Sequence, residues 1–148
     1  MILVSACLAG INCRYDGGNS TNEKVCRLVK AGKALPVCPE VLGGLPTPRV
    51  SCEIVVDAEG NKRVMSKHGR DFTGEFAAGA QKTLQIARII EAKQAILKSR
   101  SPSCGYGYVY DGQFGGTFRQ GNGMTAELLL RSGIEVLCAD DLPPDFTG

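Results

Sequence analysis

The stretch that decides the fold is residues 37–49, Val-Cys-Pro-Glu-Val-Leu-Gly-Gly-Leu-Pro-Thr-Pro-Arg. The apolar run 34–37 predicts a buried strand, which should stop at Pro39 because proline has a fixed φ and no backbone N–H. Two glycines and two further prolines follow, and they favour a stiff loop that allows a close approach of other groups. We therefore expect Cys38 and Glu40 to be held in fixed positions where a strand ends.

Two other segments have the same design, in which a buried apolar run ends in a loop that contains cysteine. The runs 1–6 and 94–98 each lead into such a loop, with Cys7 in the first and Cys104 in the second. In parallel α/β sheets the carboxyl ends of the strands share one edge, and ligands bind there. We therefore expect these two thiols and that of Cys38 to lie near one another.

The order of the predicted elements indicates an α/β fold. We expect strands at 1–6, 34–38, 94–98 and 134–139, and a β-hairpin at 53–57 and 63–65. Helices are expected at 21–32 and at 125–133, and a longer helix of roughly twenty residues should follow the loop 68–71. A strand–helix–strand unit of this length should be parallel and right-handed. The pattern predicts a three-layer sandwich with a four-stranded parallel sheet, Rossmann-like or flavodoxin-like, with a β-hairpin insertion. The chain is expected to form a single domain, 1–148.

Composition and charge exclude several classes of protein. The formal net charge is only +2, and no run approaches the roughly 18 apolar residues of a membrane span. We therefore expect no membrane contact, and no nucleic-acid partner because a basic excess is missing. Residues 1–5 lack the basic region of a signal peptide, so we expect a cytoplasmic location. The sequence does not indicate an oligomeric state.

Seven cysteines suggest specific chemistry in a protein of this kind. A reducing compartment disfavours disulfides and the number is odd, so the alternatives are metal ligands, reactive groups or buried packing residues. Three thiolates from three loops can bind an iron–sulfur cluster or zinc, and Cys13 could be a fourth ligand. Core packing with redox chemistry is the competing interpretation. Plain packing or surface positions are expected for Cys26, Cys52 and Cys138.

A few other polar residues are candidates for the site. Glu40 could act as a general acid or base, or it could only cap the loop. Ser101 and Ser103 could orient a substrate or a water molecule, although hydroxyl groups also stabilise loops of this kind. Arg49 could anchor an anion or a carbonyl group, but a solvated side chain is the more common outcome. The single histidine, His68, is expected at the surface.

Taken together, these segments resemble a family of small bacterial and archaeal proteins that includes the thiouracil desulfurases. The resemblance rests on the blocks 4–10, 13–17, 37–49 and 98–105, and it covers nearly the whole chain. Its Cys-Pro-Glu-Val-Leu-Gly-Gly and Ser-Pro-Ser-Cys-Gly motifs are long enough to be specific. Ala9, where leucine is expected, is a mild departure that should affect packing only.

The resemblance implies a cofactor. Members of such a family are expected to hold a [4Fe–4S] cluster through three cysteines, with the fourth iron open. Carried onto this sequence, the ligands are Cys7, Cys38 and Cys104. Cys13 also matches a family position, so it is the alternative for one of the three.

The resemblance also implies a reaction, the non-redox removal of sulfur from a small thiolated base such as 2-thiouracil, with release of sulfide. Glu40 would be the proton carrier, and Ser101 matches a family position near the substrate. A thiocarbonyl sulfur is soft and suits an open iron site. The alternative from a different class is a non-catalytic metal-binding or thiol-redox sensing domain. Members of such a family need not share one substrate, so the resemblance implies the fold of this chain more securely than its activity.

Overall fold

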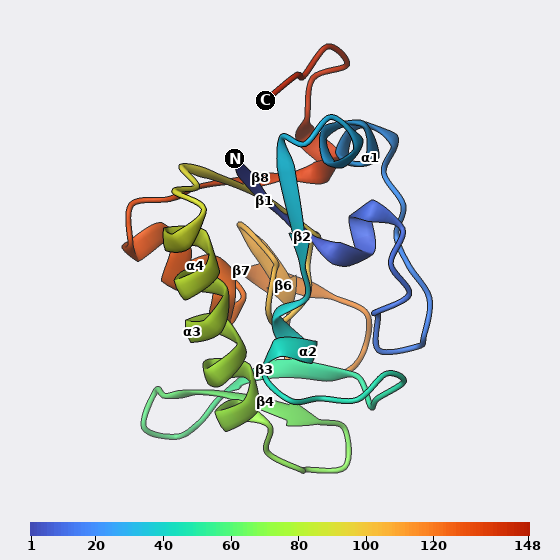
Figure 1. Ribbon diagram of the computed structural model, residues 1–148. Helices are drawn as coiled ribbons and strands as arrows, with labels where there is room; N and C mark the ends of the chain where they lie inside the picture. The colour runs from blue at the N-terminus through green and yellow to red at the C-terminus, as the bar shows by residue number, and fades with distance from the viewer.

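The computed structural model describes residues 1–148 as an α/β protein built around four parallel strands (Figure 1). The sheet has the order β2-β1-β5-β8, with bounds β1 Ile2–Ser5, β2 Ala34–Val37, β5 Gln94–Leu97 and β8 Glu135–Cys138. The helices are α1 Glu23–Lys30, α2 Pro39–Leu42, α3 Thr73–Ile89 and α4 Met124–Arg131, with short 3-10 segments η1 Ala6–Ala9 and η2 Ala139–Asp141. Two antiparallel pairs complete the fold, β3 Cys52–Val56 with β4 Lys62–Ser66 and β6 Tyr108–Tyr110 with β7 Phe118–Gln120. The predicted parallel sheet and the hairpin insertion are confirmed.

Helices cover both faces of the sheet, which explains why its strands are apolar nearly throughout. Successive side chains of a strand point to opposite faces. Ile2 and Val4 accordingly pack with Val25 and Leu28 of α1, whereas Leu3 packs in a second cluster with side chains of α3 and α4. This arrangement is the predicted three-layer sandwich. None of its helices has both the length and the apolar character needed to cross a bilayer.

The strand order creates a natural ligand-binding edge. From β1 the chain crosses to β2 on one side, while from β5 it crosses to β8 on the other, so β1 and β5 are neighbours at which the direction of winding reverses. This is the flavodoxin-like order, and ligands in such folds bind outside the carboxyl ends of the strands at this reversal. In Figure 1, α2 and the β3–β4 hairpin lie at the end of the molecule toward which β2 runs.

The segment after β2 differs from the sequence-based expectation. Residues 39–42 form a single helical turn, α2, rather than an irregular loop. Pro39 is accommodated because the first position of a helix needs no backbone donor. Cys38 is the residue before the turn and Glu40 lies within it, so the thiol and the carboxylate are both attached to a regular element.

Two glycines let α2 pack directly against the backbone of α3. A Cβ atom on Gly43 would lie 2.1 Å from the carbonyl oxygen of Glu75, and a Cβ atom on Gly79 would lie 1.9 Å from that of Pro39. Real side chains cannot make such contacts, so both positions require glycine for the close approach that the sequence suggested. The position of Glu40 therefore depends on α3, which lies more than thirty residues later in the sequence.

Replacing Gly79 with alanine should destabilise the protein. We expect Gly79→Ala to lower the free energy of unfolding by about 1–3 kcal/mol, because the added methyl group forces the two helices apart. Gly74→Ala is the matched control, since it lies in the same helix with no atom within 4 Å of a new Cβ. Urea denaturation measures both. A loss no larger for Gly79→Ala than for Gly74→Ala would contradict the close-packing argument.

Candidate functional site

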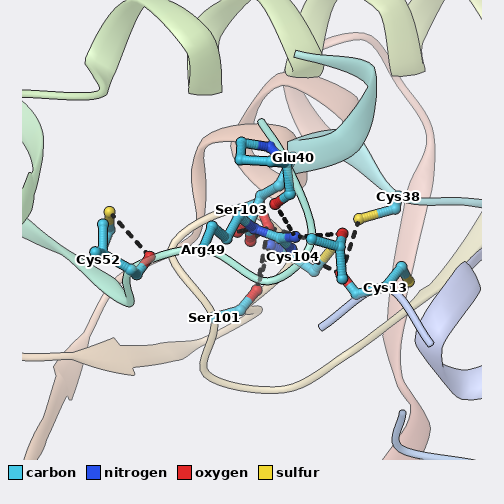
Figure 2. A network of polar contacts seen from close by, with 11 residues as sticks. Cys13, Cys38, Glu40, Arg49, Cys52, Ser101, Ser103 and Cys104 are labelled. Carbon is cyan, nitrogen blue, oxygen red and sulfur yellow. Dashed lines mark hydrogen bonds and ion pairs between the residues drawn. The ribbon is translucent and has the colours of Figure 1, made fainter. Parts of the chain in front are cut away.

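A cavity of about 350 Å³ lies at the carboxyl-terminal edge of the sheet. Its walls come from the loops that follow β1, β2 and β5, together with the start of β3 and Tyr110 of β6. The segments that the sequence singled out thus border one space. Figure 2 shows how several of their side chains meet there.

The structure brings five thiols to this cavity, four of them from the loops after β1, β2 and β5 and the fifth, Cys52, from β3. Cys7 is supplied by η1, Cys38 by the residue before α2 and Cys104 by the loop after β5, and all three line the cavity with Cys13. The Sγ atom of Cys38 lies 3.9 Å from the carbonyl oxygen of Cys13. The convergence expected from the parallel topology is therefore observed.

Burial favours the neutral form of the thiols of Cys7, Cys13 and Cys104. Burial raises the pKa of Cys104 to about 12, although hydrogen bonds from Ser5 and Ser103 oppose the shift. Burial also raises the pKa of Cys13 to about 12, with further contributions from the neighbouring Cys38 and Cys7. The pKa of Cys7 is raised by burial and then by Cys38. Because metals bind thiolates, occupation of this site must release protons.

Glu40 is fixed through both of its carboxylate oxygens. Oε1 accepts a hydrogen bond from Nε of Arg49 at 3.0 Å, and Oε2 accepts one from the Ser103 hydroxyl at 2.7 Å. The ion pair is well shielded, with side-chain exposures of 6% for Arg49 and 15% for Glu40. Figure 2 shows this carboxylate among the side chains of Ser103, Arg49 and Cys104. The carboxylate therefore joins α2 to the proline-rich segment and to the loop after β5.

Of the two interpretations of Arg49, the anchor for an anion or a carbonyl group is observed, and the more common solvated side chain is not. Its guanidinium group is buried and makes four hydrogen bonds. Besides Glu40, it donates to the carbonyl oxygens of Pro46 and Cys13, at 3.1 and 2.8 Å, and to the Thr47 hydroxyl at 3.0 Å. Arg49 therefore connects α2 with the loop after β1 and with its own proline-rich segment.

The loop after β5 is pinned from two sides. Within it, the Ser101 hydroxyl accepts a hydrogen bond from the backbone N–H of Cys104 at 2.7 Å. From α4, the backbone N–H groups of Met124 and Thr125 donate to the carbonyl oxygens of Pro102 and Ser103 at 2.8 and 2.9 Å. Ser101 thus lines the cavity, as expected of a residue near a ligand, but its hydrogen bonds with the Cys104 N–H and the Ser103 hydroxyl show that it also shapes the loop.

Two residues of β3 enter the cavity wall although the sequence gave little indication of it. Cys52 was expected to be a packing or surface residue, and it does pack in a buried cluster with Ile54 and Phe76, but it also lines the cavity. Burial raises its pKa to about 11. Glu53, beside it, is 8% exposed and also lines the cavity. By contrast, Cys26 and Cys138 do not line it, and His68 is exposed in a turn.

The fold and the thiol-lined cavity define the class of protein to which this chain belongs. Residues 2–141 match the model of the 2-thiouracil desulfurase family, so the chain is a member of that family. The resemblance that the sequence blocks suggested is confirmed.

Two relatives make the membership more specific. The chain is 44% identical over 147 residues to the uncharacterized protein YbbK of Bacillus subtilis (strain 168), a match that covers 96% of this chain and 97% of YbbK. It also superposes with a TM-score of 0.87 on the solved structure of TudS, described as a [4Fe–4S]-dependent thiouracil desulfidase, at 43% sequence identity. That match covers 96% of this chain and 92% of the TudS chain.

Removal of the buried guanidinium group of Arg49 should destabilise the protein far more than removal of a guanidinium group at the surface. We expect Arg49→Met to lower the free energy of unfolding by about 3–5 kcal/mol, because it leaves the buried Glu40 carboxylate without its counter-charge. Arg63→Met is the control, because Arg63 is half-exposed and pairs with Asp57 and Asp71 only at 3.6 and 3.7 Å. That loss should stay below about 1 kcal/mol. Equal losses in urea denaturation would show that the Arg49 contacts do not hold the site together.

Proposed function

We propose that this protein removes sulfur from a small thiolated pyrimidine of the 2-thiouracil type and releases it as sulfide. One observation carries the proposal: a carboxylate fixed at both oxygens and five thiols border a single cavity at the ligand-binding edge of the sheet. Membership of the 2-thiouracil desulfurase family and the likeness to TudS support it.

The donor set of the cavity fits a [4Fe–4S] cluster. Cysteine thiolates are the usual ligands of such clusters, and three of them leave one iron without a protein ligand. We propose Cys7, Cys38 and Cys104 for this role, since each comes from a loop after a different strand of the sheet. No three His, Cys, Asp or Glu side chains group closely enough to hold a single metal ion.

The reaction needs water, a proton carrier and a polarised carbon–sulfur bond. When bound, the cluster would supply a Lewis-acidic iron with affinity for a soft thiocarbonyl sulfur. Water adds to the carbon that carries the sulfur, the carbon–sulfur bond breaks, and the products are the oxo base and hydrogen sulfide. No electrons are gained or lost in this exchange, so no external reductant is consumed.

Glu40 is the residue that we propose as proton carrier. Its carboxylate keeps a free lone pair on each oxygen besides the two that accept from Arg49 and Ser103, so it can take a proton from the attacking water. Arg49 compensates its charge, and Ser103 fixes its orientation. We propose that Ser101, which also lines the cavity, lies against the substrate.

A reducing compartment suits this site. All seven cysteines are free, and the buried ones of the cavity have raised pKa values. We therefore propose a cytoplasmic location, where thiols stay reduced. A small molecule is the proposed partner, because the cavity volume of about 350 Å³ suits a single ring.

Anaerobic reconstitution with iron and sulfide, followed by an assay with 2-thiouracil, tests the proposal. We expect visible iron–sulfur absorbance, and equal amounts of uracil and sulfide as products. A cluster without turnover would redirect the search to other thiolated bases. Failure to assemble any cluster would refute the proposed cofactor and favour a thiol-redox role.

Loss of a ligand should remove both the cluster and the activity. We expect Cys104→Ala to lack the visible absorbance after reconstitution, because two thiolates cannot hold the cluster in place. Cys26→Ala, outside the cavity, should retain it. Cys13→Ala and Cys38→Ala, compared side by side, decide which of these two is a ligand. If absorbance is kept in Cys38→Ala and lost in Cys13→Ala, Cys13 and not Cys38 is the third ligand of the cluster.

Loss of the proton carrier should separate cluster binding from catalysis. We expect Glu40→Gln to bind the cluster normally but to reduce kcat by about 10²–10⁴-fold, the usual contribution of a positioned general base. Glu23→Gln, at an exposed position of α1, should be fully active. Iron content, absorbance and the rate of sulfide release are the measurements. A Glu40→Gln variant with an unchanged rate of sulfide release would refute the proposed role of the carboxylate.

A further inference from the structure

A second carboxylate lines the cavity and has no part in the chemistry described above. The side chain of Glu53, in β3, is buried against the turn between β6 and β7. Its Oε1 accepts hydrogen bonds from the backbone N–H groups of Gly112 and Phe114, at 3.0 and 3.1 Å. Two backbone donors therefore hold one oxygen of this carboxylate in a fixed position.

The other oxygen of Glu53 is not used within the protein. Oε2 makes no hydrogen bond, and the ion pairs of the molecule do not include this residue. Two side-chain polar atoms are fully enclosed without a hydrogen-bond partner, Nε of Arg119 and Oγ1 of Thr125. Oε2 of Glu53 is not one of them, so it keeps some exposure. A mostly buried carboxylate is costly unless its oxygens find donors. Because Glu53 lines the cavity, its unpaired oxygen is a ready acceptor for a ligand bound there.

The turn that holds Glu53 is shaped for this contact. Gly112 and Phe114 both have positive φ values, 87° and 57°, and phenylalanine rarely adopts such a conformation. A Cβ atom on Gly112 would lie 2.6 Å from the carbonyl oxygen of Ile54, so the turn also packs closely on β3. Strained backbone of this kind persists only where surrounding contacts enforce it. Here it aims two N–H groups at one carboxylate oxygen.

We propose that Glu53 is a substrate-binding residue whose Oε2 accepts a hydrogen bond from a ring N–H of the pyrimidine. This inference rests on the proposed function and adds a determinant of specificity to it. Uracil and 2-thiouracil each carry two ring N–H donors, N1–H and N3–H, whereas an ionised carboxylate can only accept. Glu53 should therefore select rings that keep the contacted N–H and reject rings alkylated at that nitrogen. Sites with buried polar groups discriminate strongly against analogues that leave those groups unpaired.

Glu53→Gln separates the binding role from a structural one. The amide oxygen of glutamine can still accept from Gly112 and Phe114, while its NH₂ group replaces Oε2 and presents donors to the ring. The fold should therefore persist, with an unchanged urea midpoint, while the group that faces the ring changes from a hydrogen-bond acceptor to a donor. Glu59→Gln removes the same charge from an exposed position in the turn of the same hairpin, and it is the matched control.

The probe is uracil, titrated calorimetrically under anaerobic conditions into the reconstituted full-length protein. We expect Glu53→Gln to weaken uracil binding by about 10- to 100-fold, as for loss of a hydrogen bond to a charged group, and Glu59→Gln to leave it unchanged. One of 1-methyluracil and 3-methyluracil should bind the wild-type protein with a similar loss. That same analogue should bind wild type and Glu53→Gln about equally, because the contact is already absent. KM for 2-thiouracil should rise in Glu53→Gln more than kcat falls.

Three results would overturn the inference: equal uracil affinity of wild type and Glu53→Gln, wild-type binding of both methylated rings as tight as that of uracil, or no measurable uracil binding to the wild type. The methylated rings test the contact in the wild-type protein, so the inference can be checked even if Glu53→Gln folds poorly. Failure of the proposed function gives a different result. Wild-type protein that binds uracil through Glu53 but leaves 2-thiouracil intact would support this contact and reject the proposed substrate.

Discussion

The buried ion pair between Glu40 and Arg49 is the interaction on which the rest of the site depends. Its guanidinium group also reaches the carbonyl oxygen of Cys13, so α2, the proline-rich segment and the loop after β1 are joined at one point. Because both charges are shielded from water, breaking the pair leaves an uncompensated charge inside the protein. The Ser103 hydroxyl on the second carboxylate oxygen extends the same network to the loop after β5.

This network places polar and sulfur chemistry side by side at one edge of the sheet. The thiols are buried deeply enough that burial raises the pKa of Cys7, Cys13 and Cys104, whereas Glu40 keeps a charged partner. A cluster that binds here must displace protons from the thiols, and its assembly is therefore linked to pH. The carboxylate stays beside the thiols as a separate acceptor for protons from water.

Much of the fold could be predicted from the sequence because the signals are local. The apolar runs and the glycines that end helices predicted the parallel sheet and its helices, which the structure confirms. The three cysteine loops were predicted to meet because parallel strands share an edge, and they do. The helical turn at 39–42 was not predicted, because proline at the first position of so short a helix looks the same as a loop in sequence.

The sequence alone therefore determined the layers of the fold, the three loops that carry thiols and the presence of Glu40 among them, because each follows from residue types a few positions apart. Only the tertiary structure decided that Arg49 is buried, that Glu53 faces the cavity and that Cys52 joins its wall. These positions depend on how the β3–β4 hairpin and the β6–β7 turn pack against the edge of the sheet, across contacts such as that from Glu53 to Phe114. No pattern of neighbouring residues encodes such a contact, since its two ends are brought together by the packing of whole elements.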